Sequence, residues 1–263
     1  MANLPGTGVS EMDKQIFEIH NNIRKNPKSL VKDLEEMLTK FDGLLLKRDA
    51  KVTLRTKEGE AAVKEAIEYL NKQSPIGPLK WSEEIQKAAG DHTKDIGPRG
   101  LIQHDSSDGK SGVKDRLRKY GNVVSCYGEN LSFHCDEAKA VLIQLIVDDG
   151  VINRGHRENI FNPEFNVVGI NTGEHKDFGT MTCLDYAGGF VAFGEPDPIE
   201  KQMDAFLKED VEFEMPDEVR SWKQNSKIQV QGNVAKKTTV RVLKMKDGTD
   251  RNLEKTEEKK FTI

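Results

Sequence analysis

Residues 155–163 read Gly-His-Arg-Glu-Asn-Ile-Phe-Asn-Pro, and two upstream segments lead into this stretch. Residues 101–105 read Leu-Ile-Gln-His-Asp, and residues 127–131 read Tyr-Gly-Glu-Asn-Leu. Gly and Asn favour turns, so we expect turns that aim polar side chains of these segments into a shared cleft. These side chains, at intervals of 25 and then 27 residues, are His104, Glu129 and His156.

The composition is that of a well-solvated globular protein with a modest core. Of the 263 residues, 36% are hydrophobic and 32% are charged, which suits one large domain or one domain with an extension. The net charge of −4 gives no global positive field, so we expect no nucleic-acid partner. No apolar run approaches the roughly 18 residues of a membrane span, so no transmembrane segment is expected.

The N-terminus and the cysteines bear on the cell compartment. Residues 1–8 lack the basic and apolar regions of a secretory signal. Cys126, Cys135 and Cys183 are too few for a disulfide framework, and reduced thiols fit an intracellular setting. We therefore expect an intracellular, cytoplasmic protein, with a cytoskeletal or ciliary one as a special case. An extracellular location is the alternative if a signal peptide has been removed.

Apolar spacing and turn residues predict a helical first part and a strand-rich last part. The expected helices span residues 10–25, 29–46, 58–70, 82–96, 113–120 and 137–148. The expected strands span residues 165–171, 180–186, 190–193, 227–231, 238–244 and 259–263. Turns are expected at residues 128–130, 232–233 and 247–248. The resulting segments are a tail (1–11), a main domain (12–195), a charged, partly helical linker (196–225) and a β-rich C-terminal extension (226–263).

Four motifs in order resemble one known family. Residues 78–81, Pro-Leu-Lys-Trp, and residues 88–95, Ala-Ala-Gly-Asp-His-Thr-Lys-Asp, are followed by His104, by the Gly-Glu-Asn-Leu of residues 128–131 and by the stretch at 155–160. This series is similar to the CAP superfamily, also called SCP/TAPS: cysteine-rich secretory proteins, antigen 5 and pathogenesis-related 1. The resemblance covers roughly residues 12–195 and is closest to the bacterial and protist type with His-Arg at this motif. It implies an α+β fold, an α-β-α sandwich with a surface cleft.

In many members of that family the cleft holds two histidines and two acidic residues, sometimes with zinc. The resemblance matches His104 to the first histidine, Glu129 to the first glutamate and His156 to the histidine of the His-Arg motif. Asp148 or Asp149, at the end of the preceding helix, is the candidate for the second acid. A later histidine of the animal proteins falls near Met181 and is missing here, as are the family's disulfides and signal peptide.

Two imidazoles and a carboxylate suit zinc, so His104 and His156 are the candidate metal ligands. The alternative is a buried hydrogen-bond network of the same residues that fixes loops around the cleft and needs no cofactor. Hydrolysis is disfavoured, because no serine lies in a Gly-x-Ser-x-Gly elbow.

Two functions remain open. The first is a non-enzymatic binding module that engages a protein partner, a lipid or sterol, or zinc through the cleft. The second is a structural subunit of an intracellular assembly that docks through the C-terminal extension, for example by adding a strand to a partner's sheet. No residue pattern sets the oligomeric state.

Overall fold

The structure is a computed structural model that describes residues 5–6, 8–48, 53–194, 198–231 and 234–260. At residues 198–201, 204, 230 and 231 it describes the backbone alone. The chain divides into two compact units, residues 1–193 and residues 194–263. The expected boundary between residues 195 and 196 lies outside the described residues. We call the two parts the N-terminal unit and the C-terminal unit.

The N-terminal unit is built on a four-stranded sheet with the order β4-β6-β7-β5. Its strands are β4 (Lys80–Trp81), β5 (Gly121–Phe133), β6 (Val167–His175) and β7 (Gly179–Ala192). β4 pairs parallel with β6, and the other pairs are antiparallel. Strand β5 therefore forms one edge of the sheet.

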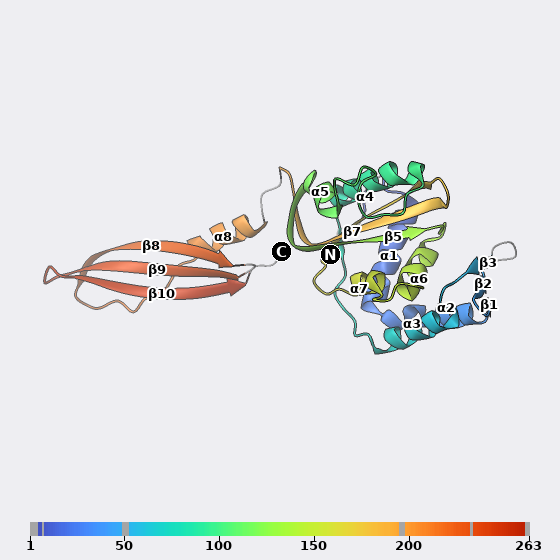
Figure 1. Cartoon of the computed structure of the whole chain (residues 1–263). Helices are drawn as coiled ribbons and strands as arrows, with labels where there is room; N and C mark the ends of the chain where they lie inside the picture. The colour runs from blue at the N-terminus through green and yellow to red at the C-terminus, as the bar shows by residue number, and fades with distance from the viewer. Residues whose placement is uncertain (1–4, 7, 49–52, 195–197, 232–233, 261–263) are drawn as a thin grey trace. The chain divides into compact units, whose positions relative to one another are not determined.

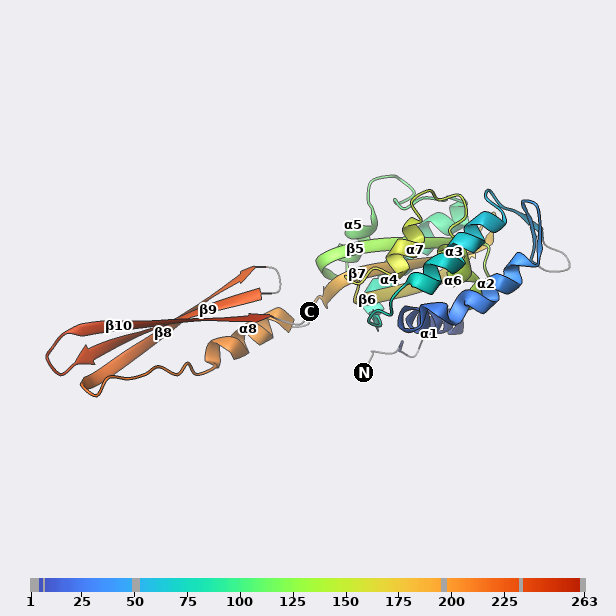
Figure 2. The ribbon, with the colours of Figure 1, turned by 90° about the horizontal axis from the view of Figure 1, so that it is seen from below.

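Helices cover both faces of this sheet (Figures 1 and 2). One face packs against α4 (Glu83–Ile96) and α5 (Val113–Arg118). The other face carries the helices α1 (Glu11–Lys25), α3 (Glu60–Lys72), α6 (Ala138–Val147) and α7 (Gly155–Ile160). This arrangement confirms the expected α-β-α sandwich.

Two serine caps start the helices that frame the sheet. Ser10 Oγ accepts the backbone N–H of Asp13 at the start of α1, and Ser82 Oγ accepts that of Ile85 at the start of α4. The Asn26-Pro27 pair ends α1 as expected, since proline disfavours a helical residue before it.

The expected helix over residues 29–46 is wrong. A short 3-10 helix (Pro27–Leu30) leads into α2 (Val31–Leu38), which is followed by β1 (Phe41–Asp42), β2 (Leu45–Lys47) and β3 (Thr53–Arg55). These strands form a separate sheet with the order β1-β2-β3. Gly43, at a φ of 60°, makes the turn between β1 and β2, which a helix cannot accommodate.

The expected turn at residues 128–130 is also wrong, because these residues lie inside β5. Glu129 pairs with Asp185 of β7, and the ladder continues to Phe133. The irregularity comes earlier, as a bulge between Val124 and Tyr127. Gly128 serves close packing rather than a turn, since a Cβ there would lie 2.7 Å from the Phe165 ring.

Strand β7 runs unbroken where two strands were expected. Gly188 falls at the bulge between the paired residues Ala187 and Gly189, and the strand continues through it, with Gly189 paired to Val124 of β5. A second 3-10 helix (Gly97–Arg99) follows α4 and leads into the loop that carries His104. None of the described helices is long and apolar enough to cross a membrane.

The C-terminal unit consists of α8 (Pro198–Lys208) and a three-stranded antiparallel sheet with the order β10-β9-β8. The strands are β8 (Val219–Gln231), β9 (Val234–Met245) and β10 (Asp250–Lys260). Gly248, at a φ of 89°, lies in the expected turn between β9 and β10, and the expected turn at residues 232–233 lies outside the described residues. Within this unit, α8 packs on β8 and β9.

The β-rich extension thus begins earlier than expected, at Val219 rather than at residue 226. Residues 219–225 have few apolar side chains, but their backbone pairs with β9 as far as Met245. The last strand begins at Asp250 rather than at residue 259, and residues 261–263 of the expected strand lie outside the described residues. Long ladders of polar residues lack the apolar alternation that makes a strand visible in a sequence.

Candidate functional site

Glu129 is the centre of the first histidine pair. Its side chain is buried, and its Oε1 lies 2.7 Å from Nδ1 of His104. Its Oε2 accepts a hydrogen bond from Arg116 of α5, whose guanidinium also donates to the carbonyl of His104 at 2.9 Å. The imidazole of His104 remains 57% exposed. The arrangement thus fixes one end of a histidine whose other end faces solvent.

Charge around Glu129 is set by its neighbours. Burial alone would favour the neutral acid, but the hydrogen bond from His104 and the charge of Arg116 hold the pKa of Glu129 below its usual value. The same hydrogen bond raises the pKa of His104. Glu129 is therefore an anion matched by a buried arginine and a histidine that readily takes a proton.

Asp148 and His156 form the second pair. Asp148 caps α6 at a φ of 55°, a left-handed position, and its side chain is buried. Its Oδ1 lies 2.6 Å from Nδ1 of His156, and its Oδ2 accepts the backbone N–H of His156 at 3.0 Å. Of the two aspartates expected as the second acid, Asp148 therefore contacts a site histidine.

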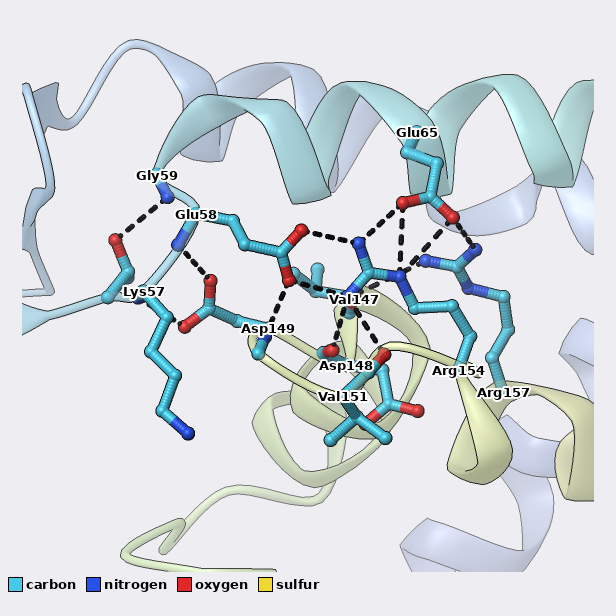
Figure 3. A network of polar contacts seen from close by, with 12 residues as sticks. Lys57, Glu58, Gly59, Glu65, Val147, Asp148, Asp149, Val151, Arg154 and Arg157 are labelled. Carbon is cyan, nitrogen blue, oxygen red and sulfur yellow. Dashed lines mark hydrogen bonds and ion pairs between the residues drawn. The ribbon is translucent and has the colours of Figure 1, made fainter.

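Asp149 has a different role. Its carboxylate accepts the backbone N–H groups of Lys57 and Glu58 at 2.7 and 2.8 Å, just before α3 begins (Figure 3). Asp149 thus connects the loop after α6 to the start of α3. Among the described residues, no hydrogen bond joins Asp149 to His104 or His156.

Arg154 reinforces the same connection. It lies immediately before α7 at a φ of 49°, and its guanidinium bonds Glu58 at 2.7 Å and Glu65 at 2.6 Å (Figure 3). Arg157, one turn further along, also reaches Glu65, at 3.0 Å. These ion pairs hold the 148–157 loop, and hence the Asp148–His156 pair, against α3.

Consecutive residues of β5 connect the two pairs. The Glu129 side chain holds His104, while the amide of Asn130 donates to the carbonyl of His156 at 2.9 Å. Asn159 of α7 returns two hydrogen bonds, to the carbonyl of Glu129 at 3.2 Å and to Asn130 Oδ1 at 2.8 Å. Since neighbouring Cα atoms are about 3.8 Å apart, one short piece of β5 positions both histidine-bearing segments.

The imidazoles share a feature that suits a metal. Each presents Nδ1 to a carboxylate, and no hydrogen bond from a described residue engages Nε2 of His104 or His156. Histidine metal ligands typically donate one ring N–H to a carboxylate and bind the metal through the other nitrogen. Each histidine, taken by itself, therefore has the ring orientation of such a ligand, with Nε2 as the nitrogen left for a metal.

A second group of possible ligands lies deeper. Within the described part of the chain, Glu129, Cys183 and Asp185 place ligand atoms within 4.8 Å of one another. Burial, followed by the neighbouring carboxylate charges, raises the pKa of Cys183 and that of Asp185 well above their usual values. Arg116 already neutralises Glu129, and proximity alone does not make these three residues a metal site.

Four contributors to this geometry escaped the sequence analysis: Arg116, Asp185, Arg154 and Glu58. Arg116 and Asp185 reach Glu129 only through the packing of α5 and the register of β7. Of the four, only Arg154 lies next to a motif of the sequence analysis, since it precedes the Gly-His-Arg stretch. Its left-handed backbone and its ion pair with Glu58 cannot be predicted from the order of residues.

The family comparison agrees with this fold and these residues. The model of the cysteine-rich secretory protein family, CAP, matches residues 17–186, which is more than half of the chain. This chain belongs to the CAP family. The expected resemblance is thereby confirmed, and the matched region includes both histidine pairs.

Two solved structures are similar at low identity. An outer surface protein from Borrelia burgdorferi is 16% identical, with a TM-score of 0.38, and the match covers 50% of this chain and 96% of that one. NaASP2, in a structure with Zn²⁺, is 16% identical with a TM-score of 0.36, and the match covers 76% of this chain and 94% of that one. A search of curated proteins found no match.

Proposed function

We propose that this CAP-family chain is a non-enzymatic binding module whose site is marked by His104 and His156. The observation that supports this proposal is the pair of imidazoles with Nδ1 held by Glu129 and Asp148 and with Nε2 open. When bound, Zn²⁺ would supply a fixed positive charge for a ligand group of a protein partner, or of a lipid or sterol.

The surrounding nucleophiles support binding rather than catalysis. A catalytic serine is commonly activated by a neighbouring histidine within hydrogen-bond reach. Three serine hydroxyls near these segments bond other groups than His104 or His156: Ser106 bonds Asp108, Ser107 bonds Asp95 and Ser132 bonds Gln144. Burial raises the pKa of the Cys183 thiol, which makes it a poor nucleophile.

Zinc titration of the full chain tests the site. We expect the wild type to bind Zn²⁺ in a calorimeter and His104→Ala/His156→Ala to lose that binding. His134→Ala is the matched control, because His134 is an exposed histidine whose Nδ1 lies 3.1 Å from the carbonyl of Phe178, away from both pairs. Zinc binding that is equal in the wild type and the double variant would reject the metal site.

Flotation with vesicles of phosphatidylcholine and cholesterol tests the lipid and sterol form of the proposal. If the histidine site carries that binding, His104→Ala/His156→Ala should float less than the wild type, and His134→Ala should float like it. If all three proteins float equally, or if none floats, the lipid and sterol form of the proposal is rejected and binding of a protein partner is retained.

A second candidate function is that of an assembly subunit that docks through the C-terminal unit. It is supported by the three-stranded sheet, whose outer strands β8 and β10 have no further strand beside them in the described residues. Truncation after residue 193 should abolish recruitment into such an assembly while zinc binding persists. Unchanged recruitment of the truncated chain would exclude this candidate.

A further inference from the structure

The two edges of the C-terminal sheet differ in charge. β10 carries four acidic and four basic residues, and this mixture discourages pairing with any one kind of strand. β8 carries only basic charges, from Arg220, Lys223 and Lys227. All three side chains are exposed, and no ion pair joins any of them to a described residue. β8 is thus an edge strand with uncompensated positive charge.

The surface beside β8 adds to this charge and provides apolar contact. Lys244 of β9 pairs in register with Ser221 and also has no ion pair among the described residues. Two exposed apolar residues, Trp222 and Val242, line a hollow of about 100 Å³ together with Ser221, Lys223 and Lys244. Pockets for separate small molecules are usually about 300 Å³ or larger, so this hollow suits a side chain of an added strand.

The sheet already holds an acidic extended segment of its own chain. Residues 209–218, Glu-Asp-Val-Glu-Phe-Glu-Met-Pro-Asp-Glu, follow α8 without regular structure. Arg241 donates to the carbonyl of Val211 at 3.0 Å, and its guanidinium lies 4.7 Å from the Phe213 ring and 4.4 Å from the Trp222 ring. Arg241 of β9 therefore holds this segment through the carbonyl of Val211 and the ring of Phe213, while no ion pair among the described residues engages the charges of β8.

We propose that β8 docks an extended acidic segment of a protein partner as a fourth strand of this sheet. Backbone hydrogen bonds to the edge would supply strand pairing, and Arg220, Lys223 and Lys227 would select acidic side chains. Pairing of β8 with β8 of a second copy is disfavoured, because like charges across an antiparallel pair repel. The inference rests on the second candidate function and names its partner chemistry.

A labelled peptide of thirteen residues, the length of β8, with alternating Thr and Glu is the probe. Fluorescence anisotropy with the full chain should show binding that weakens as salt rises. Lys223→Glu/Lys227→Glu should weaken it about tenfold or more, since two attractions become repulsions. The control is Lys246→Glu/Lys260→Glu, an equal charge change at two exposed lysines outside β8, which should bind nearly as the wild type.

Three further probes separate strand addition from simple charge attraction. A peptide of the same sequence with every backbone nitrogen methylated keeps the charge but cannot donate the hydrogen bonds of a strand, and it should bind about tenfold more weakly. Equal binding of the N-methylated peptide, or tighter binding of single-stranded DNA or of phosphatidylserine vesicles, would overturn the proposal. So would dimerisation of the chain alone through β8, seen by light scattering and lost in Lys223→Glu/Lys227→Glu.

The β8 variants should also retain the zinc binding of the wild type. A β8 variant that loses peptide binding but keeps zinc binding is therefore impaired at β8 alone. His104→Ala/His156→Ala, if it loses zinc binding but keeps peptide binding, is impaired at the histidine site alone.

Discussion

The Nδ1 atom of His104 lies 2.7 Å from Oε1 of Glu129, on a carboxylate that also neutralises the buried guanidinium of Arg116. Glu129 therefore has two tasks, because it orients a partly exposed imidazole and it compensates a buried charge. Because of the second task, we expect Glu129 to stabilise the fold whether or not the histidine binds a ligand.

Glu129→Ala should destabilise the protein by about 3–5 kcal/mol, since Arg116 is left as a buried, unpaired charge. Urea unfolding measures this free energy. Glu129→Gln should cost less, because the amide oxygen can still accept a hydrogen bond from Arg116. Glu174→Ala, at an exposed strand residue, is the control and should have little effect. A Glu129→Ala protein as stable as this control would contradict the assigned role.

Replacement of Arg24, like that of Glu129, should lower the stability of the protein. This buried residue of α1 has no acidic partner among its hydrogen bonds and instead binds four backbone carbonyls, those of Gly77, Ile160, Asn162 and Phe165. Lysine lacks the planar fork that reaches several acceptors, so Arg24→Lys should cost roughly 2–4 kcal/mol in urea unfolding. The exposed Arg99→Lys is the control, and equal stability of the two variants would refute this account.

The ion pair of Glu58 with Arg154 gives a prediction about acid. Hydrogen bonds from Arg154 hold the pKa of Glu58 at about 2, below its usual 4.5. A lowered pKa in the folded state contributes stability that is present above pH 4.5 and is lost as the pH falls towards 2. The stability difference between the wild type and Glu58→Gln should therefore shrink between these pH values. A difference that stays constant across that range would show that the pair does not titrate as described.

His20 predicts acid sensitivity at a higher pH. Burial, helped by the charge of Arg24, lowers the pKa of His20 to about 3 from its usual 6.5. The folded state keeps His20 neutral while the unfolded chain takes up a proton, so stability is lost as the pH falls from 6.5 towards 3. His20→Phe preserves an aromatic ring against Tyr186 and removes the titration. Between pH 7 and pH 4, the variant should lose roughly 3 kcal/mol less than the wild type, and parallel losses would contradict this.

Short-range signals made most of the N-terminal unit predictable. A few neighbouring residues are enough to predict the cap at Ser82, the apolar face of α4 and the break at Asn26-Pro27. The structure has all three as expected. The order of the motifs also led to the right family and to the α-β-α layers.

Long-range pairing was not predictable in the same way. Gly128 suggested a turn, yet it lies in a strand where the Phe165 ring leaves no room for a Cβ. Only the register of β5 with β7 brings Asp185 opposite Glu129, and only the packing of α5 brings Arg116 to it. The polar strands of the C-terminal unit were placed too short because their pairing depends on backbone rather than on apolar side chains.

The central proposal is that His104 and His156 bind one metal ion through Nε2 of imidazoles that carry their proton on Nδ1. Nitrogen-15 NMR of the histidine rings in the full chain measures it most directly, with each signal assigned through His104→Ala and His156→Ala. We predict that both rings are in the Nδ1–H form at a pH where they are neutral and that the Nε2 signals of both shift together on addition of one equivalent of Zn²⁺. An Nε2–H form in either ring, or a zinc response in only one of them, would contradict the claim.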